Sequence, residues 1–264
     1  MLGKCALCLL QKDLQKSHLI PRSMYKKIRS AGPGNNDPMV ATSSGKKARS
    51  SYQYQDHLLC WDCEQLFRAN GEDYAARIAA TKGKFPLLDI LNAAIPDSEA
   101  HGIKAYSATS TPAIDRAKLA YFAISVFWRA SVKSWYEVDG KESRIEMGAK
   151  YNEEIRRYLL GETPAPSVAY LLVGVCTDPL YQGMFHAPTL AAPAAHRVYG
   201  FLTCGMDFRF SIGRASPTQL ATISMLKMPE QWITSGDCTK AARVKMVAEA
   251  DNQAAFRDNS SRSS

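Results

Sequence analysis

The chain has 264 residues, which is too long for a minimal metal knuckle and fits one large domain or a small domain followed by a medium one. Hydrophobic residues make up 46% of it and charged residues 22%, as is ordinary for a folded soluble protein with a buried core. The formal net charge is +8, and residues 1–50, with ten Lys or Arg and two Asp, carry all of this excess.

The sequence shows no sign of a signal peptide or a membrane span. Its start, "MLGKCALCLLQKD", has no apolar run behind a basic head. The longest strongly apolar stretch, residues 119–128, has about half of the roughly 20 residues that a membrane-spanning helix needs. We therefore expect a cytoplasmic protein, in which CxxC pairs bind metal or do redox chemistry more often than they form structural disulfides.

The basic segment at the start of the chain would attract a polyanion such as nucleic acid. A solvated basic face with no partner is the alternative. Its candidate nucleic-acid-binding residues are Arg22, Lys26, Lys27, Arg29, Lys46, Lys47 and Arg49.

Residues 1–83 are predicted to form a first domain. In chain order we expect a zinc knuckle, a strand over residues 14–20 and a short basic helix that Pro21 opens. The polar segments "AGPGNNDP" and "ATSSGKKARSS" are predicted to be flexible loops. The stretch "YQYQDHLL" is strand-like, and helical spacing of apolar residues runs from Trp61 to about Ala80. The segment "TKGKFP" is the predicted boundary.

Residues 84–257 are predicted to form a larger α/β domain around a buried central helix. That helix is expected from Thr111 to about Tyr136, and the amphipathic "AKYNEEIRRYLLG" is expected to end at Gly161. The segments "SVAYLLVGVC" and "HRVYGFLTCGMDFRFSIG" read as strands, the second bending or bulging near Gly205. The role of this domain is left open between substrate recognition, binding of a regulatory ligand and dimerisation.

The end of the chain and the remaining cysteines and histidines carry weaker signals. Asp237 is expected to cap a last helix that runs to about Phe256, and residues 258–264 are expected to be disordered. A loop, "APTLAAPAA", is predicted between two histidines that lack ligand spacing, and three scattered cysteines are predicted to be buried thiols. These residues are His186, His196, Cys176, Cys204 and Cys238.

Two CxxC pairs, Cys5 with Cys8 and Cys60 with Cys63, have the spacing of a structural zinc site. Two residues between the cysteines of a pair form a tight turn that aims both sulfurs at one point, so two pairs complete a tetrahedron. The alternatives are four unrelated cysteines or a redox centre, although thioredoxin-type chemistry needs only one pair. Such a zinc site positions other residues and performs no chemistry itself.

If zinc joins the two pairs, the strand that carries His18 lies beside the first turn of the helix that begins at Trp61, where Glu64 follows the last cysteine. The order CxxC, "SHLIP", "LLC" and "CE" resembles the zinc-stabilised form of the HNH nuclease family, over residues 5 to about 81. The resemblance implies an α+β protein, with an N-terminal zinc-bound ββα-metal domain at residues 1–83 and a mixed α/β domain after it.

The resemblance also implies roles for individual residues. His18 would be the general base that takes a proton from the attacking water. Glu64 would hold a catalytic Mg²⁺ or Mn²⁺, with Glu72, Asp73 or water as further ligands. Gln55 stands where the family has its middle asparagine, with Asp56 next to it, and either would accept a hydrogen bond from the His18 ring.

Departures and alternatives accompany these assignments. Ser17 stands where the family usually has an acidic or histidine ligand, and a neutral hydroxyl is a poor metal ligand. His18 could be a satisfied core residue, and Glu64 could be a first-turn acid favoured by the helix dipole. Glu72 could be a solvated helix residue, and His57, in the strand before the zinc cysteines, is a weaker candidate.

The resulting expectation is a DNA-cutting HNH endonuclease with a structural Zn²⁺ and a catalytic Mg²⁺ or Mn²⁺. Family-level analogy adds a role in defence against phage or other foreign DNA. RNA remains an alternative substrate, and a homo-oligomer is left open. The competing hypotheses are a catalytically inactive zinc module that binds nucleic acid, which Ser17 favours, and a protein-interaction adaptor whose basic face is incidental.

Overall fold

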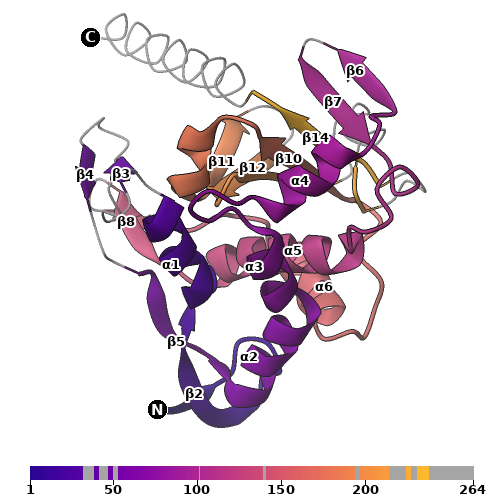
Figure 1. The fold of residues 1–264 in the computed structure, drawn as a ribbon. Helices are drawn as coiled ribbons and strands as arrows, with labels where there is room; N and C mark the ends of the chain where they lie inside the picture. Colours follow the sequence, from indigo (N-terminus) through magenta and orange to yellow (C-terminus); the bar gives the residue numbers. More distant parts are fainter. Residues whose placement is uncertain are drawn as a thin grey trace, which may run out of the picture.

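The structure is a computed structural model that describes residues 1–31, 39–41, 47–49, 53–100, 102–138, 141–193, 197–213, 224–226 and 231–237. It is a mixed α/β protein (Figure 1). Within the described residues, no helix combines the length and the apolar character that crossing a membrane requires.

The N-terminal part is built on a three-stranded antiparallel sheet in the order β1-β2-β5. Its strands are β1 (Leu2–Lys4), β2 (Gln11–His18) and β5 (Gln55–Cys60). The strand predicted at residues 14–20 therefore begins three residues earlier and ends two residues earlier. It ends at His18 because the chain leaves the sheet before Pro21 and starts helix α1 (Arg22–Ala31). A register shift between Leu14 and Lys16 interrupts the pairing of β2 with β5. Strand β5 leads directly into helix α2 (Trp61–Phe67).

The helix predicted from Trp61 to about Ala80 is confirmed as one continuous helical segment, but its middle turn is a π-helix. The segment consists of α2, the π-helical η2 (Arg68–Glu72) and α3 (Asp73–Ile78). Two turns of a regular α-helix contain about seven residues, and a π-helical turn adds one residue to this number. Glu72, which lies eight residues after Glu64, is therefore on about the same face of the helical segment as Glu64.

Helix α5 (Arg116–Val132) is the predicted buried central helix, although it is shorter than expected at both ends. Asp115, not Thr111, caps its first turn, because the Asp115 carboxylate accepts a 3.0 Å hydrogen bond from the Lys118 backbone N–H. At the other end, Tyr136 begins strand β8 (Tyr136–Val138) instead of ending the helix.

Helix α5 is buried because it lies between the main sheet and the α2–η2–α3 segment (Figure 1). On the sheet side, Phe127 packs 4.9 Å from Phe201, ring centre to ring centre. On the other side, Trp128 meets Phe67 edge-to-face at 6.0 Å. The backbones come close at Gly71, where an added Cβ would lie 2.7 Å from the Phe122 backbone nitrogen. A side chain at this position would therefore push the π-helical turn away from α5.

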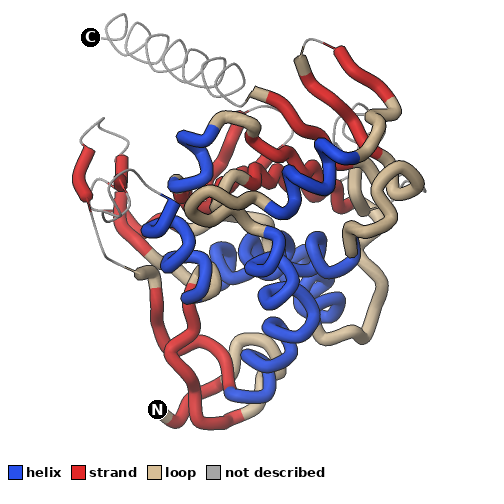
Figure 2. Tube along the Cα trace, viewed as in Figure 1, coloured by secondary structure: helices blue, strands red, loops and turns tan. Residues whose placement is uncertain are grey.

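The main sheet has seven strands in the order β11-β12-β13-β10-β14-β7-β6, with β10 and β14 parallel and the other neighbours antiparallel. Figure 2 draws strands in red and helices in blue. The strand predicted at residues 167–176 is confirmed as β10, which begins two residues later. The strands are β6 (Ser98–Ala100), β7 (Ile103–Tyr106), β10 (Ala169–Cys176), β11 (Phe185–Pro193), β12 (Arg197–Thr203), β13 (Met206–Ile212) and β14 (Ile233–Gly236).

Two predictions in this sheet are corrected. The single strand expected to bend near Gly205 is a hairpin of β12 and β13, because Cys204 and Gly205 both have positive φ, as a two-residue hairpin turn needs. The loop expected between His186 and His196 is mostly strand β11, which pairs with β12 from Phe185 to Pro193.

The remaining elements lie around this core. They are β3 (Met39–Ala41), β4 (Lys47–Arg49), α4 (Pro86–Ala93), β9 (Lys141–Ser143), α6 (Ala149–Leu159) and the 3₁₀ turn η3 (Pro179–Gly183). Gly161, with φ +77°, stops α6 two residues after its last helical residue, as predicted. Most of "AGPGNNDP" and "ATSSGKKARSS", the predicted last helix and the C-terminal tail lie outside the described residues.

The three scattered cysteines have different outcomes. Cys204 is a fully buried free thiol, as predicted. Cys176 is buried but disulfide-bonded, so its prediction as a thiol is wrong. Cys238 lies outside the described residues.

The predicted boundary between residues 83 and 84 stays a prediction. Residues on both sides of it belong to one hydrophobic core. Polar contacts also link the two parts: Arg156 on α6 donates a 2.7 Å hydrogen bond to the Leu7 carbonyl.

Candidate metal centre and the adjoining polar site

The four predicted cysteines meet at one point. Their sulfurs all lie within 4.8 Å of one another, and the Cys8 and Cys60 sulfurs are 3.9 Å apart. Sulfurs placed about 2.3 Å from a tetrahedral Zn²⁺ are roughly 3.8 Å from each other, so the cluster has the dimensions of such a site. All four thiols are free. The cluster predicted from the two CxxC pairs is confirmed, and it could hold a metal ion such as zinc.

Local hydrogen bonds shape this cluster. The Cys60 backbone N–H donates to the Cys5 sulfur at 3.3 Å, and the Ala6 backbone N–H donates to the Leu58 carbonyl at 3.0 Å. The first bond and a stronger one from the Cys63 thiol lower the pKa of Cys5 to about 4. Metals bind thiolates and not thiols, so these hydrogen bonds favour the form of Cys5 that can bind a metal.

Ser17 connects the strand pair to the head of α2. It is fully buried, and its hydroxyl donates a 2.5 Å hydrogen bond to the Glu64 carboxylate. The same oxygen accepts a 3.0 Å hydrogen bond from the Leu59 backbone N–H on β5. Ser17 therefore fixes the position of the Glu64 carboxylate relative to both strands.

His18 is the last residue of β2 and is half-buried. Neighbouring residues of a strand point to opposite faces. While Ser17 reaches Glu64, the His18 ring lies 6.2 Å from the Tyr25 ring, centre to centre. Burial lowers the pKa of His18, and the positive charges of Arg22 and Arg129 lower it further.

The side chain that hydrogen-bonds the His18 ring is Gln53, which raises the pKa of His18 against the effect of burial. Gln55 and Asp56 are the partners that the sequence predicts for this ring, and that prediction stays a prediction. Gln55 is exposed, and it is the residue of β5 that lies opposite His18 in the β2–β5 pair. Asp56 forms a 2.6 Å ion pair with Lys133, which lowers the pKa of Asp56.

Glu72 interacts electrostatically with both His18 and Glu64. Its side chain is 12% exposed and forms an ion pair with Arg129, whose side chain is 1% exposed. Burial raises the pKa of Glu72, the Arg129 charge opposes this, and the Glu64 charge adds to it. Glu72 also acts electrostatically on His18. The two predicted site residues His18 and Glu64 thus share one charged neighbour.

The other predicted site residues lie farther out on the fold. Asp73 pairs with Arg68, and both are exposed. His57 pairs in register with Lys16 on β2. Of the candidate nucleic-acid-binding residues, Arg22 and Lys26 are exposed on α1, and Lys27 and Arg29 are partly exposed there. Lys47 and Arg49 belong to β4, and Lys46 lies outside the described residues.

No family model, no curated protein and no solved structure matches the chain.

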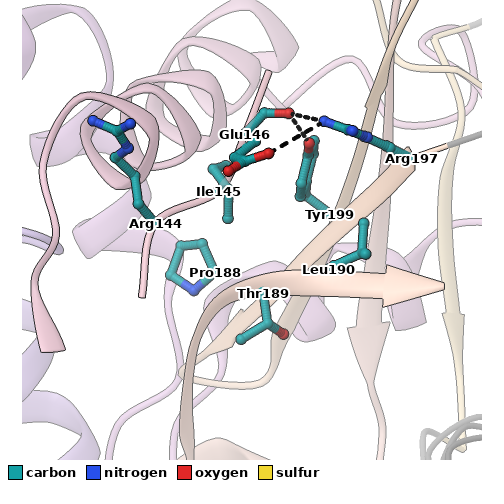
Figure 3. Close-up of a pocket in the computed structure, with 8 residues that line it drawn as sticks. All are labelled: Arg144, Ile145, Glu146, Pro188, Thr189, Leu190, Arg197 and Tyr199. Atoms are coloured by element: carbon teal, nitrogen blue, oxygen red, sulfur yellow. Dashed lines mark hydrogen bonds and ion pairs between the residues drawn. The ribbon is translucent and has the colours of Figure 1, made fainter. Parts of the chain in front are cut away.

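A cavity of about 310 Å³ opens elsewhere, between residues 144–146 and strands β11 and β12 (Figure 3). Its polar groups bond to one another: Arg197 donates a 2.9 Å hydrogen bond to the Glu146 carbonyl, and the Tyr199 hydroxyl donates to the same oxygen. None of the predicted site residues lines it. The cavity therefore adds nothing to the chemistry of the candidate site.

Sequence reasoning missed three contributors to this site. The sequence marks Ser17 only as a poor metal ligand, whereas the structure shows that it positions Glu64. Arg129 lies in the predicted central helix, and a charge among so many buried apolar residues signals a buried partner. Gln53 carried no separable signal, because a glutamine near a strand end is common.

Ser17→Ala is expected to destabilise the protein by about 1–3 kcal/mol, because it leaves the buried Leu59 N–H without its acceptor. It also frees the Glu64 carboxylate, so any activity that depends on Glu64 should fall as well. Denaturant unfolding measures the first effect. The matched control is Ser125→Ala: Ser125 is equally buried, but its hydroxyl donates within α5 to the Phe122 carbonyl. An equal loss of stability in both variants would contradict the bridging role of Ser17.

Proposed function

We propose that the protein is an HNH-like endonuclease that hydrolyses phosphodiester bonds in DNA, with a structural Zn²⁺ and a catalytic Mg²⁺ or Mn²⁺. The observation that carries the proposal is the four-cysteine cluster, which joins the β2–β5 pair to the first turn of α2. This strand–strand–helix order places His18 at the end of the first strand and Glu64 on the helix. The proposal includes a cytoplasmic location.

In the proposed reaction, His18 takes a proton from water as its oxygen attacks the phosphorus, and the bond to the leaving 3′ oxygen breaks. Burial favours the neutral imidazole, which is the form that accepts a proton. Glu64 would hold the divalent ion, which neutralises charge on the scissile phosphate when bound. Ser17 keeps the Glu64 carboxylate in place.

The basic face of α1 supports DNA as the substrate. Arg22 and Lys26 are four residues apart on this helix and are exposed, so they lie on one face of it. Arg22 is also close enough to His18 to lower its pKa. Contacts from such residues to phosphates would orient the backbone at the site without reading its sequence.

A second function, a zinc module that binds nucleic acid without cutting it, is favoured by one observation. The carboxylates of Glu64 and Glu72 are already bonded, to Ser17 and Arg129 respectively. A divalent ion would have to bind Glu64 through its remaining oxygen lone pairs.

The deciding experiment measures nicking of supercoiled plasmid by the zinc-loaded protein with Mg²⁺, Mn²⁺ or EDTA. Glu64→Gln removes the charge that holds the ion and keeps the size of the side chain. We expect nicking that needs a divalent ion and that Glu64→Gln abolishes. The matched control is Asp62→Asn, an exposed acid of the same helical turn that pairs with Lys12.

Binding of plasmid without nicking under any divalent ion would instead establish the second function. Absence of binding at low salt, where phosphate contacts are strongest, would exclude both functions.

A further inference from the structure

Arg129 is a charged residue in the buried central helix α5. Its side chain is 1% exposed, and the residues around it on α5 are almost all buried. Burying a guanidinium is costly unless it is paired and hydrogen-bonded. The groups that pair with the Arg129 guanidinium therefore indicate its role.

The guanidinium of Arg129 contacts three pieces of the N-terminal part. Nη2 pairs with Glu72 on η2, and Nη1 donates to the Leu19 carbonyl at 3.4 Å. The group also lies over the Phe67 ring, 4.7 Å from its centre. Leu19 directly follows His18, so the arginine holds the end of the strand that carries the imidazole and the helical turn that carries Glu72.

A purely structural arginine on the same helix offers a comparison. Arg116 is 4% exposed, and its guanidinium donates to the carbonyls of Ser107 at 2.6 Å and Gln231 at 2.7 Å. These partners belong to the larger part of the chain and lie outside the candidate site. Arg129 and Arg116 are thus similar in burial and differ in what they hold.

We propose that Arg129 is a positioning residue of the candidate site, which holds the end of β2 and the π-helical turn in the arrangement that the site needs. The inference rests on the proposed nuclease function for its activity readout. It also means that α5, which follows the predicted domain boundary, takes part in forming the candidate site.

The first test compares R129M, R129K and R116K. A displacement of about 1 Å at a reacting group can lower a rate about 100-fold. We expect R129M to lower kcat for nicking at saturating DNA and Mg²⁺ by about that factor, with the KM for DNA and the zinc content unchanged. R129K, which keeps the charge, should recover part of the loss, and R116K should stay within about twofold of wild type.

R129M leaves the Glu72 carboxylate buried without its partner and is at risk of failing to fold. The double variant R129M/E72M removes both charges together, so it should fold and still lose turnover. Thermal unfolding of each variant, compared with R116K, separates loss of fold from loss of position.

The second readout does not depend on activity. The Leu19 backbone N–H donates a 2.9 Å hydrogen bond to the Tyr54 carbonyl. Hydrogen exchange should show reduced protection of this amide in R129M and R129M/E72M but not in R116K. If the wild type cuts no DNA and Leu19 still loses protection, the nuclease function fails and the positioning role stands. Unchanged Leu19 protection together with unchanged turnover in R129M overturns the role of Arg129.

Discussion

Replacing His18 with alanine is expected to lower the turnover number for plasmid nicking by about 10²–10⁴-fold, the contribution typical of a general base. The ring is half-buried at the end of β2, and its burial favours the neutral form that accepts a proton. DNA affinity should change little, because the exposed cations of α1 are untouched. Nicking rates at saturating DNA and a filter-binding titration measure the two quantities.

The matched control is His57→Ala. His57 lies on the neighbouring strand β5, where it pairs in register with Lys16 instead of facing Tyr25. This variant should keep turnover within about threefold of wild type, since a surface change away from special features has small effects. Similar losses in both variants would show that neither imidazole is the base.

The pH dependence of nicking follows from the same residue. Burial lowers the pKa of His18 below its ordinary value of 6.5, helped by the charges of Arg22 and Arg129 and opposed by Gln53 and Glu72. A general base works when unprotonated, so kcat/KM should fall as the pH drops through this lowered pKa, with its midpoint below pH 6.5. Arg22→Gln removes one cation and should move the midpoint upward. A midpoint above 6.5 would contradict the environment found for His18.

The sequence predicts those parts of the fold that local chemistry determines. The four cysteines carry ligand spacing in both pairs, and the helix after Trp61 has an apolar stripe of helical period. The central helix is predicted from a stretch that is apolar nearly all round, with Thr111 as its expected start. Proline after a threonine resembles a helix start, but the Asp115 carboxylate, which bonds to the N–H three residues on, determines the actual one.

The parts that sequence reasoning missed depend on contacts between distant residues. A π-helical turn leaves no plain pattern, yet here it coincides with the close approach of Gly71 to α5. The bond from Ser17 to Glu64 joins residues 47 positions apart, and the pair of Arg129 and Glu72 joins residues 57 apart. The packing of whole helices and strands determines which residues meet in this way. A single sequence gives no local pattern from which these pairs could be predicted.

Loss of a cysteine from the four-cysteine cluster, which is proposed to hold zinc, is expected to have the largest effect on stability. Structural zinc binds zinc-finger peptides with about 10–16 kcal/mol at neutral pH, whereas a whole domain is stable by only about 5–15 kcal/mol. Cys63→Ser removes the cysteine of this cluster that lies on α2, so the proposed zinc should no longer bind and the β2–β5 pair should be released. The metal content of the purified protein and hydrogen exchange at β2 and β5 measure these outcomes.

Cys204→Ser is the control for this prediction. Cys204 is also a buried free thiol, but it lies in the turn between β12 and β13, so its replacement should leave the zinc content unchanged. Because the cluster joins the strand of His18 to the helix of Glu64, nicking should vanish with the zinc, and added Mg²⁺ should not restore it. A zinc-free Cys63→Ser protein that keeps full exchange protection in β2 and β5 would show that the metal does not hold these elements together.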